Sequence, residues 1–193
     1  MAQSFDIRTN AKQVAKSLGR KSKKHIPEAT RWAINNTAKK LQKAYKVQTE
    51  KKLDRPTKFT TNGFFIKYAR RNNLEAFVQV KDVVAKYLKW QIEGGVSTPN
   101  RPEAVPTENR KLNKYGNIPG RKLVKSNNIV RPTKKGMGVW TNPKKGTPKL
   151  LIAFKTSINY TKRFPFYKIG NNVIKNVFPK ELKFSLKKEM RRK

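Results

Sequence analysis

One long amphipathic segment, residues 26–48, constrains the fold of this chain more than any other. It reads IPEATRWAINNTAKKLQKAYKVQ, and Pro27 suits the first turn of a helix because its missing N–H would be unsatisfied there anyway. Glu28 follows it and complements the positive end of a helix dipole. At about 3.6 residues per turn, one broad face carries the side chains suited to a core. They are Ile26, Ala29, Ala33, Ile34, Thr37, Leu41, Ala44 and Tyr45.

The opposite face of this predicted helix is cationic. Its basic residues are Arg31, Lys39, Lys43 and Lys46. Trp32 projects onto the same face, between Lys39 and Lys43. We therefore expect one face of the helix in a core and one basic face that presents a tryptophan.

The C-terminal segment, residues 178–193, repeats this combination. Leu182, Leu186 and Met190 share one helical face. The opposite face carries Phe184 among the basic residues Lys183, Lys187, Lys188 and Arg191. Upstream, residues 163–177 predict a helix with Phe166, Ile169, Val173 and Val177 on one side, which Pro179 either interrupts or restarts.

The segments on either side of the first helix are less regular. Residues 10–19 predict a short amphipathic helix that Gly19 ends, and residues 19–25 a basic linker. Residues 62–82 predict a β-hairpin, because apolar residues alternate on both sides of a turn at residues 70–73. Asp82 can cap a short helix that stops at Gly94. That helix is apolar almost all round, so we expect it to be largely covered, with Trp90 as an interface aromatic.

Residues 96–149 differ from the rest of the chain. Proline and glycine are frequent and no period is sustained, which favours an extended arm that orders against a neighbour. Residues 150–154 predict a strongly apolar strand that residues 139–140 can join, and residues 158–160 continue it or begin its partner. Together these features predict an α+β fold: a long N-terminal helix and a C-terminal helix packed on a small antiparallel β-sheet. We expect a single domain over residues 1–193, with 96–149 as a long Pro/Gly-rich loop or arm inserted between its halves.

The net charge of the chain points to a polyanionic partner. Lysine and arginine number 47 against 11 acidic residues, giving +36. The excess is spread along the chain and is not confined to one tail. Self-repulsion on this scale opposes compaction, and nucleic acid is the commonest polyanion. The alternative is a surface that is merely very soluble.

The sequence offers little for catalysis. It has no cysteine, its only histidine is His25, and the serines lie in no nucleophile motif. No phosphate-binding glycine loop is present. Glu181 and Lys183 form a Glu-x-Lys pair, as some nucleases use, but Glu181 is better explained as a first-turn acid after Pro179. We expect no enzyme, catalytic residue, metal site or cofactor, and no apolar run is long enough for a membrane helix.

Aromatic residues set among lysines have two interpretations. Trp32 and Phe184 can stack on exposed bases, or they can be buried against another element or subunit. The second interpretation is preferred, with Trp32 as an interface anchor. No zinc finger, RNA-recognition signature or helix-turn-helix spacing is evident, so sequence-specific base reading is not expected.

Two segments of the chain resemble the minor tail protein Z family of long-tailed phages, also described as tail completion proteins. The first has Ile26-Pro27 leading into Ala33-Ile34-Asn35 and Ala38, like the proline-started helix of that family. The second has Arg163-Phe164-Pro165, a following helix, Phe178-Pro179-Lys180-Glu181-Leu182 and a basic Met-Arg ending. The segments YLKWQIEGG and LNKYGNIPG depart from the family and resemble small phage head–tail proteins more generally.

This resemblance implies a virion structural protein, assembled in the host cytoplasm, at the head–tail junction or tail end. Its partners would be neck, tail tube or tail terminator subunits, further copies of itself in a ring, and DNA contacted without sequence specificity. Either DNA or an acidic partner would contact the two basic helix faces. The alternatives are a sequence-independent nucleic-acid-binding protein of nucleoid or ribosomal type and, with the least support, a nuclease.

Overall fold

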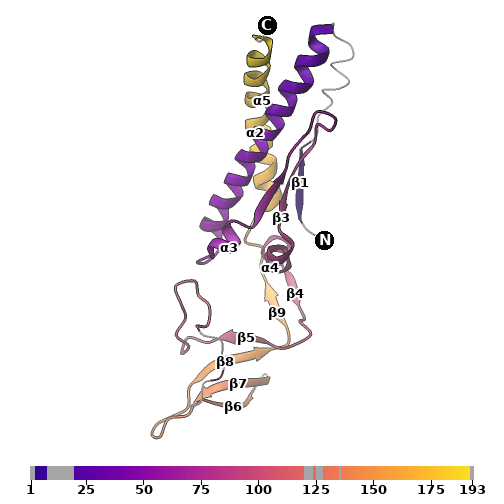
Figure 1. The fold of residues 1–193 in the computed structure, drawn as a ribbon. Helices are drawn as coiled ribbons and strands as arrows, with labels where there is room; N and C mark the ends of the chain where they lie inside the picture. The colour runs from indigo at the N-terminus through magenta and orange to yellow at the C-terminus, as the bar shows by residue number, and fades with distance from the viewer. Residues whose placement is uncertain (1–2, 8–19, 120–123, 125–127, 135, 192–193) are drawn as a thin grey trace. The chain divides into compact units, whose positions relative to one another are not determined.

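The computed structural model describes residues 3–7, 20–119, 124, 128–134 and 136–191. It divides the chain into two compact units, residues 1–92 with 163–193, and residues 93–162. In the first unit, two long helices pack with a three-stranded sheet and two shorter helices (Figure 1). Its elements are β1 (Ser4–Ile7), α2 (Arg20–Lys52), α3 (Lys58–Thr61), β2 (Phe64–Lys67), β3 (Ala76–Val80), α4 (Asp82–Glu93) and α5 (Phe166–Met190).

The sheet of the first unit has the order β1-β3-β2, and both pairings are antiparallel. The hairpin of β2 and β3 closes with a bridge between Arg70 and Asn73, as the sequence predicts. Strand β1 was not predicted; four residues are too few to carry a period. Helix α2 packs on β2 and β3, while α5 contacts α2 and β1. The predicted α+β architecture of two terminal helices on a small antiparallel sheet is thus confirmed.

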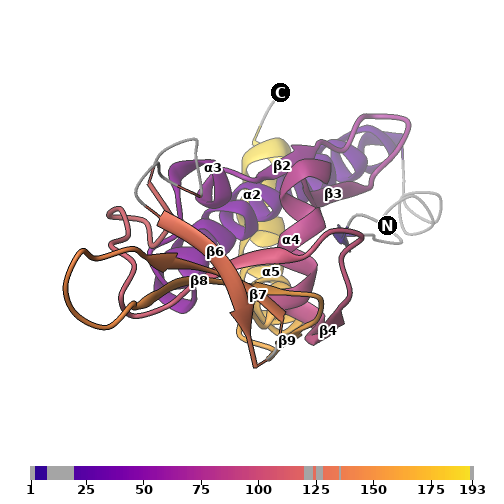
Figure 2. The ribbon, with the colours of Figure 1, turned by 90° about the horizontal axis from the view of Figure 1, so that it is seen from below.

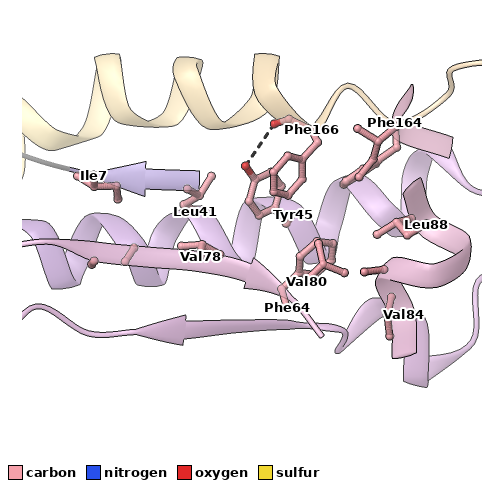
Figure 3. Packing of buried hydrophobic residues seen from close by; sticks show 14 of the residues in the cluster. Ile7, Leu41, Tyr45, Phe64, Val78, Val80, Val84, Leu88, Phe164 and Phe166 are labelled. Carbon is pink, nitrogen blue, oxygen red and sulfur yellow. Dashed lines mark hydrogen bonds between the residues drawn. The ribbon is translucent and has the colours of Figure 1, made fainter. Parts of the chain in front are cut away.

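An aromatic cluster fills the centre of the first unit. The Tyr45 ring of α2 stacks on Phe166 of α5 at a centroid distance of 4.4 Å and on Phe64 of β2 at 5.2 Å. Its hydroxyl donates to the Phe166 carbonyl at 3.2 Å (Figure 3). Because the phenol is buried, its pKa is raised. Tyr45 thereby joins both long helices to the sheet.

Two amide side chains of α2, one of them buried, attach this helix to the hairpin. Asn35 exchanges two hydrogen bonds with the backbone of Ala69: its Nδ2 donates to the Ala69 carbonyl at 3.1 Å, and the Ala69 N–H donates to its Oδ1 at 2.8 Å. Gln42 Nε2 donates to the Phe64 carbonyl at 2.8 Å. These bonds satisfy backbone groups that the sheet edge would otherwise leave unpaired.

Both long helices are longer than the sequence predicts. Helix α2 begins at Arg20, so the expected linker at 19–25 is helical from residue 20 and Pro27 lies inside the helix instead of in its first turn. Helix α5 runs through Pro179 without a break. Proline removes one helical hydrogen bond, and here the packing of each helix on its neighbour outweighs that loss. The short helix predicted at 10–19 lies outside the described residues.

Helix α4 matches the predicted short helix, but it is less covered than expected. Val84, Ala85, Leu88 and Ile92 are buried, whereas Val83 and Tyr87 are exposed. Gly63 lies directly against this helix, since a Cβ there would come within 2.8 Å of Val84 Cγ1. One face of α4 therefore completes the core of the first unit and the other remains open.

The second unit has its own sheets. Its strands are β4 (Gly95–Ser97), β5 (Glu103–Pro106), β6 (Asn128–Thr133), β7 (Gly136–Thr141), β8 (Leu150–Lys155) and β9 (Ile158–Tyr160). A four-stranded antiparallel sheet has the order β5-β8-β7-β6 (Figure 1), and β4 pairs with β9. Figure 2 shows the strands β6, β7 and β8 of this sheet from below. Val139, Leu151 and Ile152 form a small core.

The prediction of an extended arm at 96–149 is therefore wrong, because this segment supplies most of the strands of a second unit. Pairing of residues 139–140 with 150–154 is confirmed. Residues 158–160 pair with β4 and neither continue β8 nor pair with it. The strands are short and contain proline or glycine, so their alternation is too brief to register as a sequence period.

Candidate nucleic-acid interface

Helices α2 and α5 run antiparallel, and their contact changes from aromatic to polar along its length. Near Tyr45 and Phe166 the contact is aromatic. Further along, the Glu181 carboxylate accepts from Lys40 Nζ at 2.6 Å and from Asn36 Nδ2 at 3.1 Å. These donors lower the pKa of Glu181, with Lys40 contributing most. Glu181 therefore acts within the helix pair, which corrects its interpretation as a first-turn acid.

The buried face of the last turns of α5 differs from the predicted one. Ser185 and Glu189 are buried, while Met190 is 78% exposed and Leu182 and Leu186 are half-buried. A carboxylate oxygen of Glu189 lies 3.8 Å from Nδ1 of His25, which is half-buried. Glu189 is buried here because α2 places His25 opposite it, a tertiary effect that the apolar pattern of a single helix cannot register.

A hollow lies on the contact between the two helices. Its lining consists of Trp32 and Asn36 from α2 and of Phe184, Ser185, Lys188 and Glu189 from α5. We call this hollow the aromatic notch. Trp32 is 42% exposed and Phe184 is 64% exposed. The antiparallel pairing thus brings together the two aromatic residues that the sequence placed separately on cationic faces.

Arg31 differs from the other predicted contact residues because it already has acidic and aromatic partners. Its guanidinium pairs with Glu28 one helical turn away and lies 4.9 Å from the centre of the Trp32 ring. Arg71 from the hairpin turn reaches the same carboxylate at 3.4 Å. The hydrogen bond from Arg31 lowers the pKa of Glu28. Arg31 thus holds one wall of the notch in place.

The remaining predicted cations are exposed. On α2, Lys39 lies 5.8 Å from the Tyr68 ring, while Lys43 and Lys46 border a separate hollow with Thr61 and Phe64. The predicted cations Lys183, Lys187 and Lys188 of α5 and Arg191 at its C-cap are exposed. Among the described residues, none of these side chains forms an ion pair with a carboxylate.

Trp90 does not belong to this surface. It is half-buried on α4, where Lys89 Nζ lies 4.6 Å from the centre of its ring. Its predicted role as an interface aromatic therefore remains separate from that of Trp32 and Phe184.

The described part of the chain contains no group of three or more His, Asp or Glu residues that could hold a metal ion. Within the same residues, no helix is long and apolar enough to cross a bilayer. The described residues of the two helices thus offer cationic and aromatic side chains for recognition.

Comparison with known proteins identifies no significant relative of the chain. No protein-family model matches the chain, and neither the curated proteins nor the solved structures give a significant match.

Sequence reasoning missed Asn36, Ser185 and Glu189, which line the notch, and Arg71, which pairs with Glu28 beside it. Ser185 and Glu189 follow Glu181 at intervals of four, a spacing that places them on one helical face and could have indicated a polar contact. Arg71 carries no such signal, because it reaches Glu28 only through the fold of the hairpin.

Proposed function

We propose that this chain is a phage virion structural protein of the tail completion or neck type, without enzymatic activity. In this role it forms an oligomeric ring near the path of the genome and presents its basic helix faces to DNA or to acidic neighbours. Closed rings arise when head-to-tail contacts between identical subunits return to their starting point.

The observation that carries this proposal is how the family-like segments are distributed in the fold. Residues 26–38 lie in α2 and residues 163–182 lead into α5, and these helices pack against each other within the first unit. Two segments do not resemble the family. Residues 112–120 lie in the second unit, and residues 87–95 run from α4 into β4. The resemblance therefore falls on one packed structure, which supports a shared fold with an added unit.

The charge of the chain supports a polyanionic surrounding. Even if every one of the 11 acidic residues were paired once, 36 cationic side chains would have no acidic partner in the chain. A ring subunit beside DNA gains counterion release from such an excess. Acidic protein surfaces would complement the same charges.

The test is to locate the chain in purified phage particles. We expect mass spectrometry of density-purified virions to find it at a fixed copy number, a small multiple consistent with a ring. Particles assembled without it should appear in negative stain as separate heads and tails, or as tails that fail to retain DNA. Normal, infectious particles lacking the chain would overturn the proposal.

A second candidate is a free nucleic-acid-binding protein. The observation favouring it is the exposure of Trp32 and Phe184 among lysines, which a ring role does not by itself require. It predicts tight, steeply salt-dependent binding by the purified monomer and absence from particles. A metal-dependent cleavage assay with Glu181→Ala addresses the nuclease alternative; we expect no cleavage by either protein, because Glu181 is engaged by Lys40 and Asn36.

A further inference from the structure

We propose that the aromatic notch between α2 and α5 binds an unpaired base of single-stranded nucleic acid. Trp32 and Phe184 provide the surfaces on which the base stacks, and Lys188 with its neighbours holds the adjoining phosphates. This inference rests on the nucleic-acid contact in the proposed function, but it does not depend on where the protein sits in a particle.

The first argument is the exposure of the two aromatic rings. In the described structure, Trp32 and Phe184 retain 42% and 64% exposure although they border the same hollow. Neither ring belongs to the hydrophobic core around Tyr45. Exposed rings beside cations are the platform that proteins use for bases, because every base presents a flat π-face. Paired bases of a duplex are already stacked, so the notch favours a single strand.

The second argument is the polarity of the notch between its aromatic walls. Asn36, Ser185 and Glu189 line it, and the last two are buried. A pocket for an apolar anchor of another protein is normally desolvated and apolar. Amide, hydroxyl and carboxylate groups suit the hydrogen-bonding edge of a base instead. The buried Glu189 carboxylate can accept from an exocyclic amino group, as carboxylates do from cytosine.

The third argument is the charge around the rim. The nearby carboxylates already have cationic partners: Glu28 pairs with Arg31 and Arg71, and Glu181 with Lys40. Lys183, Lys187 and Lys188 are exposed and form no ion pair within the described residues. Phosphates entering beside the notch therefore meet a surplus of positive charge.

The test measures binding of the full chain to a fluorescein-labelled single-stranded oligonucleotide of about twelve nucleotides that contains cytosine, within the usual site size for single-strand binders. The same sequence in duplex form is titrated at equal salt. We expect Trp32→Ala and Phe184→Ala each to weaken single-strand binding about fivefold to 150-fold, the range that base stacking supplies, while duplex binding stays unchanged. Trp32→Phe should retain most of the affinity.

The matched control is Phe59→Ala, which removes a phenylalanine of the same unit that is 57% exposed and lies outside the notch. It should leave both affinities unchanged. Thermal melting of every variant separates loss of a contact from loss of fold. Phe184→Ala is the safer variant, because its ring is the more exposed.

Two outcomes would overturn the inference. One is equal binding of single strand and duplex with no effect of either aromatic substitution; steep salt dependence in that case would still leave the DNA contact of the proposed function standing. The other is that poly-glutamate displaces the oligonucleotide from the parent protein and that Trp32→Ala and Phe184→Ala weaken the binding of poly-glutamate as much as that of the oligonucleotide. This result would assign the notch to an acidic protein. Absence of the chain from virions would instead remove the virion role and leave the single-strand site intact.

Discussion

Gly170 of α5 lies directly against Tyr45 of α2. A Cβ at residue 170 would come within 2.8 Å of the Tyr45 hydroxyl and within 2.4 Å of Cδ2 of Phe5 on β1. No real Cβ contact is this short without a shift of its neighbours. The absence of a side chain at this position sets how closely the two long helices and the first strand approach.

Gly170→Ala should destabilise the protein, although alanine normally favours a helix over glycine by about 1 kcal/mol. Overpacking typically costs about 1–3 kcal/mol, and the Phe5 and Tyr45 rings have little room to move in this core. The measurement is the free energy of unfolding from urea titration. Asn171→Ala on the exposed side of α5 is the control and should be neutral or stabilising. A more stable Gly170→Ala protein would contradict the close approach.

Tyr45→Phe should cost about 0.5–1.5 kcal/mol, because it removes only the hydroxyl that donates to the Phe166 carbonyl. Tyr45→Ala should cost about 3–5 kcal/mol through the cavity left by a large buried ring. Both values are obtained from chemical denaturation. Tyr68→Phe removes a hydroxyl from a ring that is 47% exposed and should change stability little. An equal loss in Tyr68→Phe and Tyr45→Phe would show that the buried hydrogen bond contributes nothing specific.

Asn35→Ala should weaken the attachment of the hairpin to α2. The substitution leaves the N–H and C=O of Ala69 buried without their partner, at about 1–3 kcal/mol for each unsatisfied group. The local measurement is hydrogen exchange of the Ala69 amide, which should become faster than in the parent protein. Asn172→Ala, on an exposed position of α5, serves as control and should leave this amide protected. Unchanged exchange in Asn35→Ala would mean that the bond does not protect Ala69.

Acid should loosen the contact between α2 and α5 through Glu181. Its pKa is lowered in the folded protein from an ordinary 4.5, chiefly by Lys40. Its contribution to stability is therefore complete above pH 4.5 and is lost as the pH falls through the lower folded value. Because Lys40 is 58% exposed, solvent screening limits the effect to about 0.5–1 kcal/mol.

The measurement compares unfolding free energies at pH 7 and pH 3 for the parent and for Glu181→Gln. The difference between the two proteins at pH 7 should shrink at pH 3, because protonation of Glu181 in acid removes the charge that distinguishes the parent from Glu181→Gln. Glu50→Gln, an exposed carboxylate of α2 without an ion pair among the described residues, should track the parent at both pH values. A gap between parent and Glu181→Gln that widens in acid would reverse the sign and refute the assignment.

The sequence predicted the core face of α2 because many residues repeat its pattern. It predicted the hairpin of β2 and β3 because short alternating runs lie on both sides of a turn at residues 70–73. The first residue of each long helix was harder to predict from the sequence. Pro27 favoured a start at Ile26, yet α2 begins at Arg20, since basic residues do not oppose a helix and packing tolerates an internal proline.

The buried face of α5 near its end could not be predicted from α5 alone. Apolar residues pointed to Met190, but Glu189 is buried instead because α2 presents His25 opposite it. The aromatic notch has the same origin. Trp32 and Phe184 were each identified as an aromatic among lysines, but their adjacency requires the antiparallel pairing of helices separated by most of the chain.

The salt dependence of DNA binding tests whether the exposed lysines contact DNA, as the proposed function requires. Each phosphate contact contributes about 0.9 to the slope of log binding constant against log salt for duplex DNA. We expect the triple variant Lys183→Ala, Lys187→Ala, Lys188→Ala to reduce this slope by about 2–3, because these exposed side chains lack acidic partners among the described residues. The triple variant Lys39→Ala, Lys43→Ala, Lys46→Ala should reduce the slope similarly if both helix faces contact DNA.

The control is the triple variant Lys58→Ala, Lys67→Ala, Lys81→Ala. These lysines are exposed on the same unit outside both faces, so the net charge falls equally. Equal slopes for all three variants would mean that binding follows net charge alone and that neither helix face forms a defined contact.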